Sequence, residues 1–408
     1  MWLFDKAMKR LVRRGTVTVT DFDGSTWLYG HAEAGWPDIA LRFTEKGAAD
    51  RLVRSPRLGM AEAFMDGRLV IERGDRMKLV TLVRRNNPWE KGGRLETSSP
   101  LSAAVKYTVS KWARFNARAA ARRNVAHHYD LDDGLYDLFL DAERQYSCAY
   151  WTAETQTLDE AQRAKMAHIA AKLALEPGMR VLDIGSGWGG LAIYLHKVAG
   201  VDVTGITLST EQLGFAQARA EREGVADHVR FELIDYRDVA GRFDRIVSIG
   251  MFEHVGVYNY KRFFRQCHDL LTDDGVMLLH TIGRFGRPKA TDAFTLKYTF
   301  PGAHVPALSE MIDASEGQRL IVTDIETLRL HYARTLRAWY ANCVANKDAI
   351  VGLYDERFYR LWTFYLAGAC SGFENGGTCN YQIQYARDRR TLPPTRDYIG
   401  ERERGYAG

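Results

Sequence analysis

The sequence has few of the features that mark secreted, metal-binding or membrane-spanning proteins. Its five cysteines are scattered without Cys-x-x-Cys spacing, so neither a disulfide framework nor a zinc site is expected. No apolar run approaches the roughly 18 residues of a membrane-spanning helix, and the first residues contain no apolar signal-peptide core. These absences predict a cytoplasmic protein with reduced thiols and no bound metal.

Acidic residues are scarce in the first third of the chain. Residues 1–128 contain 24 Lys and Arg against 13 Asp and Glu, a net charge of +11, whereas all 408 residues together carry +5. Such an excess indicates an anionic partner, either a membrane surface or a nucleic acid. Residues 1–14 predict a basic amphipathic helix, which lies either on an anionic bilayer or against its own domain.

Glycines gather after the short apolar run of Val181, Leu182 and Ile184, in the order Asp-Ile-Gly-Ser-Gly-Trp-Gly-Gly at residues 183–190. A buried strand, a glycine-rich turn and a helix let the backbone of an open α/β sheet approach a nucleotide-like ligand. The turn lacks the Gly-Lys-Ser/Thr ending of a phosphate-cradling loop. Asp183 at the strand end suits a cationic or amine-bearing ligand. The stretch resembles the first motif of class I S-adenosylmethionine-dependent methyltransferases.

Apolar strand and helix patterns alternate after this turn. Such alternation predicts a Rossmann-like, doubly wound sheet whose ligand crevice lies at the strand C-termini. The predicted strands are residues 202–206, 229–234, 244–249 and 276–282, and the predicted helices are residues 157–175, 210–223 and 260–271. Ahead of the sheet, a hairpin at residues 16–29, a strand at 39–43, a helix near 48–53 and an apolar stretch at 69–71 predict a smaller N-terminal α+β domain.

We therefore divide the chain into three parts. Residues 1–86 form a basic N-terminal domain that associates with lipid or membrane. Residues 87–123 form a linker rich in Asn, Gly, Pro and Ser, followed by a cationic helix. Residues 124–408 form the catalytic domain.

Polar side chains follow several of the predicted strands. Thr207, Ser209 and Gln212 follow the second strand, where many such enzymes place an acid, and Asp235 with Tyr236 follows the next, where they could hold an adenine ring. Further along the chain, Glu253 and His280 end two more strands, and Tyr332 comes from a helix downstream. Each could be an ordinary structural residue, but convergence of Glu, His and Tyr on one crevice favours a catalytic role.

Seven short motifs resemble the cyclopropane-fatty-acid synthase and mycolic acid cyclopropane synthase family. The N-terminal domain resembles that of the longer, phospholipid-acting members more weakly. The motifs are His-Tyr-Asp-Leu at 128–131, Gln-Tyr-Ser-Cys-Ala-Tyr-Trp at 145–151, the glycine-rich stretch at 181–190, Gly-Ile-Thr-Leu-Ser at 205–209, Met-Phe-Glu-His-Val-Gly at 251–256, Leu-His-Thr-Ile-Gly at 279–283 and His-Tyr-Ala-Arg-Thr-Leu at 331–336.

The resemblance implies methyl transfer from S-adenosylmethionine to the cis double bond of a phospholipid acyl chain. The resulting carbocation loses a proton to a bound bicarbonate ion and closes to a cyclopropane ring. The implied bicarbonate cage is Cys148, Glu253, His280, the backbone of Ile282 and Tyr332. The implied cofactor contacts are Tyr146, Ser147, Asp183, Gly185, Gly187, Gly190, Thr207, Leu208, Ser209, Gln212, Asp235 and Tyr236. Cys370 matches a cysteine motif of the family in shifted form, and nothing in the reaction needs it as a nucleophile.

Other functions stay open at this stage. The same fold could end the reaction in a methylene- or methyl-branched chain, if the carbocation loses a different proton. A nucleic-acid methyltransferase would use the basic third for backbone binding, but the Asn/Asp-Pro-Pro-aromatic motif of a base-flipping pocket is missing. A non-catalytic lipid-binding protein would leave the cofactor loops unexplained. We expect a cytoplasmic enzyme on the inner face of an anionic membrane, acting on unsaturated phospholipid without nucleic acid, and leave a homodimer open.

Overall fold

The computed structural model describes residues 2–54, 56–93 and 132–406. The chain folds as two compact units, one of Met1–Ala103, Asp292–Thr299 and Ala333–Gly377 and the other of Ala104–Thr291, Phe300–Tyr332 and Thr378–Gly408. The predicted linker from residue 94 and the cationic helix lie outside the described residues, as does the motif at 128–131. The predicted division at residues 86 and 123 therefore stays a prediction.

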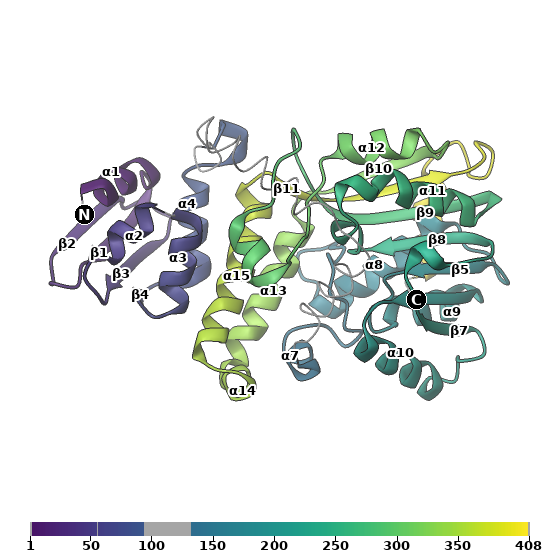
Figure 1. The fold of residues 1–408 in the computed structure, drawn as a ribbon, viewed down its shortest axis with the longest axis horizontal. Helices are drawn as coiled ribbons and strands as arrows, with labels where there is room; N and C mark the ends of the chain where they lie inside the picture. The colour runs from purple at the N-terminus through teal and green to yellow at the C-terminus, as the bar shows by residue number, and fades with distance from the viewer. Residues whose placement is uncertain (1, 55, 94–131, 407–408) are drawn as a thin grey trace. The chain divides into compact units, whose positions relative to one another are not determined.

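The second unit contains a seven-stranded sheet in the order β10-β11-β9-β8-β5-β6-β7 (Figure 1). The strands are β5 (Arg180–Ile184), β6 (Asp202–Thr207), β7 (Val229–Leu233), β8 (Phe243–Ile249), β9 (Leu271–Arg284), β10 (Ile321–Leu328) and β11 (Thr378–Ala386). The neighbours from β7 to β9 run parallel, whereas β11 is antiparallel to both β9 and β10.

Helices cover both faces of this sheet, which confirms the predicted doubly wound architecture. On one face, apolar residues of α11 (Tyr260–Leu270) and α12 (Leu308–Glu316) share a core with β5, β8, β9 and β11. On the other, α8 (Leu158–Leu173), α9 (Gly190–Ala199) and α10 (Thr210–Arg222) pack on β5, β6 and β7. Thr157 caps α8 in a reciprocal capping box with Glu160. Helix α16 (Asp397–Tyr406) also packs against the sheet, through Tyr398. Glu403 of α16 forms a hydrogen bond with His168 of α8.

The first unit begins with a four-stranded sheet in the order β2-β1-β3-β4. Its strands are β1 (Gly15–Thr20), β2 (Thr26–His31), β3 (Asp38–Phe43) and β4 (Leu69–Arg73), and its helices are α1 (Trp2–Leu11), α2 (Ala48–Arg54), α3 (Pro56–Met65) and α4 (Arg76–Arg85). The hairpin, third strand, helix and later strand predicted from the sequence are all present. Phe4 and Met8 of α1 are buried in this core, while Trp2 and Leu3 are exposed. The apolar face of α1 therefore packs on its own domain only in part.

Three later helices belong to the same unit as this sheet. These are α13 (His331–Ala345, from Ala333 onward), α14 (Lys347–Leu353) and α15 (Glu356–Asn375). Phe364 of α15 stacks on Phe64 of α3 with ring centroids 5.8 Å apart, and Arg357 pairs with Asp66 at 2.9 Å. In the described part of the chain no helix is long and apolar enough to cross a membrane.

Candidate active site

The glycine-rich turn connects β5 to α9 at the C-terminal edge of the sheet. Gly185 adopts φ 89°, and a Cβ there would lie 2.9 Å from the Cβ of Met251. Gly187 adopts φ 55°, and a Cβ there would point into open space. These two positions need glycine because L side chains rarely adopt a left-handed backbone. Gly190 is needed for a different reason, which is lack of space. A Cβ there would lie 2.7 Å from the carbonyl oxygen of Glu143.

A pocket opens beside this turn at the ends of β5, β6, β7 and β8. Seven predicted cofactor residues line it, namely Gly185, Gly187, Thr207, Leu208, Gln212, Asp235 and Tyr236. The other lining residues are Ile184, Ile206, Ile234, Arg237, Ile249, Gly250, Met251, His254 and Val255. The predicted contacts Tyr146, Ser147, Asp183, Gly190 and Ser209 do not line the pocket.

The loop after β6 is organised by its own hydroxyl groups. Thr207 Oγ1 donates to Gln212 Oε1 at 2.9 Å, so these two pocket residues hold each other in place. Ser209 caps α10 by accepting the Gln212 N–H at 3.3 Å. The N-cap bond satisfies a helix-terminal N–H that would otherwise be unpaired. Ser209 therefore supports the pocket through the helix.

Asp235 is paired with Arg237, a residue that the sequence analysis missed. Arg237 donates Nε–H to Asp235 Oδ1 at 2.7 Å, and its terminal nitrogen contacts Oδ2. Both side chains are nearly inaccessible to solvent. A bidentate guanidinium neutralises the carboxylate but leaves its remaining lone pairs able to accept a ligand N–H. The sequence does contain a signal for this ion pair, because in Asp-Tyr-Arg at residues 235–237 the carboxylate and the guanidinium are only two residues apart.

Asp183 is buried on β5 just before the turn. Burial raises the pKa of its carboxyl group to about 7, against the opposing effect of the Lys165 charge. Its Oδ2 atom is inaccessible to solvent and has no hydrogen-bond partner among the residues that the structure describes. A buried carboxylate oxygen without a partner is costly unless a ligand donates to it. This orphaned oxygen fits a cationic or amine-bearing ligand.

Glu253 lies on the short helix η4 (Phe252–His254), on the turn whose Met251 and His254 line the pocket. Its Oε1 atom accepts the Ile282 N–H at 2.6 Å, and within the described ranges its buried Oε2 atom has no hydrogen-bond partner. Burial raises the pKa of this carboxyl group to about 7. The structure thus joins two members of the predicted cage directly, and an anion bound there would share the Ile282 N–H with Glu253.

His280 lies two residues before Ile282 on β9 and faces β11. Its Nε2 lies 2.8 Å from Asn380 Nδ2, and its Nδ1 lies 3.2 Å from Gln382 Nε2. Burial lowers the pKa of His280 to about 3, so the ring is neutral and carries one N–H. One of the two amides must therefore present its oxygen to the ring. The sequence analysis did not identify Asn380 and Gln382 as neighbours of the cage. The alternation of polar and apolar residues at 380–385 is typical of a strand and could have indicated them.

The remaining cage candidates are buried on other elements. Cys148 is inaccessible to solvent on the irregular segment 145–151, and burial raises the pKa of its thiol. Tyr332 is buried at the second position of α13. Cys370 lies within α15, where its thiol donates to the carbonyl oxygen of Ala333 at 3.4 Å and burial raises its pKa to about 12. A protonated, buried thiol is a poor nucleophile, so Cys370 has no evident chemical role.

The chain resembles proteins of known function over most of its length. Residues 116–383 match the family model of mycolic acid cyclopropane synthetase. The cyclopropane-fatty-acyl-phospholipid synthase of Escherichia coli K12 is 37% identical over 339 residues, which span 83% of this chain and 85% of the relative. A probable fatty acid methyltransferase of Pseudomonas putida is 40% identical over 285 residues, 67% of this chain and 72% of the relative.

A solved structure agrees with these sequence matches. The mycolic acid cyclopropane synthase CmaA1, crystallised with SAH and CTAB, superposes with a TM-score of 0.62 at 36% identity, over 65% of this chain and 98% of that chain. The chain therefore belongs to the mycolic acid cyclopropane synthetase family and is an S-adenosylmethionine-dependent methyltransferase.

Proposed function

We propose that this protein converts a cis double bond in an unsaturated phospholipid acyl chain into a cyclopropane ring. S-adenosylmethionine would supply the methyl carbon, and bicarbonate would supply the base. The observation that carries this proposal is the buried Glu253, bonded to Ile282 and with Oε2 unpartnered, on the turn that also lines the glycine-rich pocket. The similarity to the E. coli cyclopropane-fatty-acyl-phospholipid synthase and to the mycolic acid cyclopropane synthase CmaA1 supports it.

The pocket residues have a simple task in this proposal. Gly185 and Gly187 let the ligand approach the backbone closely, and Thr207 with Gln212 offers polar contacts at the end of β6. Asp235, neutralised by Arg237, would accept a ligand N–H without adding net charge. An ionised Asp183 would favour a positively charged ligand. Together these groups suit a sulfonium compound that also carries an amine and an adenine ring.

The buried polar groups around Glu253 would handle the proton. An alkene is a weak nucleophile, so the chain must contribute positioning and electrostatic stabilisation of the developing cation. The Glu253 carboxylate would accept the hydrogen bond of a bicarbonate ion and orient it, while the Ile282 N–H and Tyr332 hydroxyl would donate to its oxygens. Neutral His280 has a single N–H, and both of its ring nitrogens already contact the amides of Asn380 and Gln382, so it would donate to bicarbonate only after one of these amide contacts is broken.

The product distinguishes this proposal from its alternative. The P. putida relative, a probable fatty acid methyltransferase, keeps a branched product as the second candidate. We expect a bacterial host expressing this chain to accumulate phospholipid acyl chains heavier by one CH2 unit, with upfield cyclopropyl proton signals. Lipid mass spectrometry and proton NMR make the measurement. If the acyl chain gains one CH2 unit by mass and shows vinylidene proton signals by NMR, the product is a methylene-branched chain. If its mass rises by a further two hydrogens, the product is a saturated chain with a methyl branch.

Membrane association would rest on the basic N-terminal helix. Lys6, Lys9 and Arg10 are exposed on α1 beside the exposed Trp2 and Leu3. We expect co-sedimentation with anionic vesicles that weakens as salt is raised, because exposed charges are screened. Replacing the three basic residues with Glu should reduce binding by more than about a hundredfold, because the loss of three positive charges at about 1 kcal/mol each already removes about 3 kcal/mol.

A matched charge reversal on the other unit provides the control. Arg222, Arg230 and Lys261 are exposed there, and the same three changes to Glu should leave vesicle binding near wild type. Equal loss in both triple variants would indicate that only net charge matters. Binding to zwitterionic vesicles in high salt would contradict an electrostatic contact.

A further inference from the structure

Helix α8 presents an unusual row of buried polar side chains. Gln162, Lys165, His168 and Lys172 are all at most 4% exposed, although α8 packs against an apolar core. Burying two ammonium groups and an imidazole costs several kcal/mol for each unpaired charge. Each of these residues therefore requires partners or a function that justifies its position.

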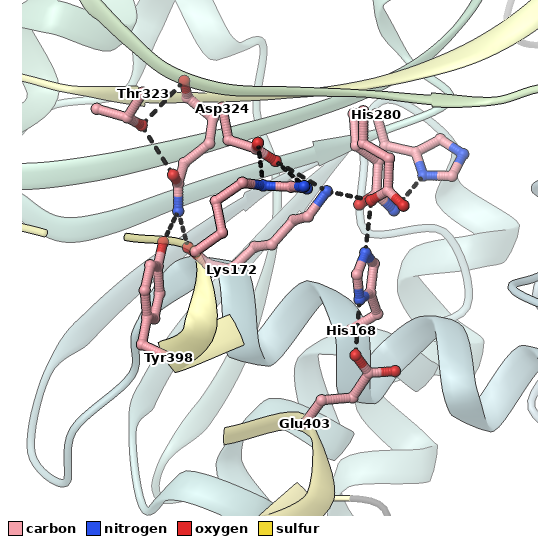
Figure 2. Close-up of polar contacts among 11 residues, drawn as sticks. His168, Lys172, His280, Thr323, Asp324, Tyr398 and Glu403 are labelled. Atoms are coloured by element: carbon pink, nitrogen blue, oxygen red, sulfur yellow. Dashed lines mark hydrogen bonds and ion pairs between the residues drawn. The ribbon is translucent and has the colours of Figure 1, made fainter. Parts of the chain in front are cut away.

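The C-terminal half of this row is accounted for by ion pairs. Lys172 Nζ lies 2.5 Å from Glu326 and 3.4 Å from Asp324, both on β10. His168 bridges Glu326 at 2.7 Å and Glu403 of α16 at 3.0 Å (Figure 2). These groups join α8, β10 and α16 through paired charges. Their role is structural.

Lys165 is different because it forms no ion pair within the described part of the chain. Its Nζ donates to two neutral oxygens, Gln145 Oε1 at 2.6 Å and Ser147 Oγ at 2.9 Å. The acidic groups that influence its charge are Asp141, Asp183 and the Cys148 thiol, and it in turn disfavours protonation of His280. Its fully buried ammonium therefore lies in the field of Asp183, whose Oδ2 has no partner.

The segment that Lys165 holds has no helix or strand of its own. Gln162, one turn earlier on α8, donates Nε2–H to the carbonyl oxygens of Gln145 and Ser147, both at 3.0 Å. Asp141 accepts the Gln145 N–H at 2.9 Å. Two side chains of α8 thus fix residues 145–147 through four hydrogen bonds. Tyr146, Ser147 and Cys148, all candidates for the cofactor site or the cage, depend on this anchor for their placement.

We propose that Lys165 is a positioning residue that couples residues 145–147 to the glycine-rich motif, because its ammonium holds the Ser147 hydroxyl and the Gln145 amide, whose Nε2 would lie 2.8 Å from a Cβ at Gly190. This inference rests on the proposed assignment of Asp183 and residues 146–148 to the cofactor site. The charge of Lys165 favours the ionised form of Asp183, and the same ammonium holds Gln145 and Ser147. Loss of the charge therefore raises the pH above which Asp183 is ionised and at the same time releases the segment.

The test is calorimetric binding of S-adenosylmethionine between pH 6 and pH 9, roughly one to two units on each side of the pKa of about 7 for Asp183. Burial lowers the pKa of Lys165 itself to about 8, so the wild-type midpoint is taken from the part of the profile below that pH. Lys165→Met keeps the length of the side chain and removes the charge. We expect its affinity to fall about tenfold at neutral pH, with the midpoint of the affinity–pH profile moved up by about one unit. In an Asp183→Asn background, Lys165→Met should move no midpoint. Lys165→Arg, which restores the charge, should return the midpoint toward wild type.

Lys172→Met is the matched control, since it removes a second buried lysine of the same helix. It should lower the unfolding temperature without moving the midpoint. If Lys165→Met does not fold, Lys165→Gln, which keeps a hydrogen-bond donor, takes its place. An unchanged midpoint in a folded charge-removing variant overturns the inference, whereas a wild-type chain that binds no cofactor at the glycine-rich pocket overturns the proposed function instead.

Discussion

Replacing Glu253 with glutamine is expected to lower turnover by about 10²–10⁴-fold, the usual scale for disabling acid–base catalysis, with little change in S-adenosylmethionine affinity. The structure gives the physical reason. Glu253 Oε1 is held by the Ile282 N–H at 2.6 Å, which leaves the buried Oε2 as the free acceptor. A glutamine would present an NH2 group at one of these two positions, so it would lose either the backbone bond or the acceptor for bicarbonate.

The pH dependence of turnover has a defined sign. Burial raises the pKa of Glu253 to about 7, so the carboxyl group is mainly neutral below this pH and ionised above it. Because the ionised form is the acceptor, turnover at saturating cofactor should rise as pH increases through about 7. This rise should be absent from the residual activity of Glu253→Gln.

The decisive assay compares turnover in buffer stripped of carbon dioxide, with and without added bicarbonate. Wild type should recover activity when bicarbonate is added, and Glu253→Gln should not. Glu326→Gln serves as a control because it removes another carboxylate, which is partly buried, lies 2.7 Å from His168 and is separate from Glu253. It should lower stability and keep the bicarbonate response. Wild-type activity that ignores bicarbonate, with most activity retained in Glu253→Gln, would rule out the cage.

Replacing Gly187 with valine is expected to abolish measurable S-adenosylmethionine binding. Gly187 lines the pocket at φ 55°, a conformation that a β-branched residue strongly disfavours. No atom lies within 4 Å of a Cβ built there, so the side chain would extend into open space beside the pocket instead of colliding with the core. The fold should therefore survive. Calorimetry measures the affinity, and thermal unfolding checks the fold.

Gly178→Val separates backbone strain from occupation of the pocket. Gly178 adopts φ 82°, also has open space at its Cβ position, and lies in an exposed turn before β5 outside the pocket lining. This variant should lose a similar amount of stability and still bind the cofactor. Unchanged affinity in Gly187→Val, or equal loss in both variants, would contradict the placement of the ligand at the glycine-rich turn.

Local sequence patterns were sufficient for much of the fold. The apolar run before Gly185, the glycines themselves and the alternation that follows predicted β5 to β9 and the crevice at their C-termini. Seven predicted cofactor residues line one pocket there. This succeeded because parallel strands of a doubly wound sheet all end at the same edge, so order along the chain fixes which loops meet.

Contacts between distant segments could not be predicted in this way. No strand was expected after residue 282, yet β11 inserts antiparallel between β9 and β10 and brings Asn380 and Gln382 onto His280, 100 and 102 residues away in the chain. Residues 333–377 join the unit of the N-terminal sheet, which no local pattern indicated.

The sequence by itself determined the family, the order of the parallel strands and the glycine-rich pocket, because these depend on short motifs and on the period of apolar residues. Only the tertiary structure decided which charges are shared. Arg237 neutralises Asp235, and Ile282 holds Glu253. Lys165 anchors residues 145–147 and has no carboxylate partner in the part of the chain that the structure describes. The protonation states of the site follow from these contacts and from burial, which packing alone sets.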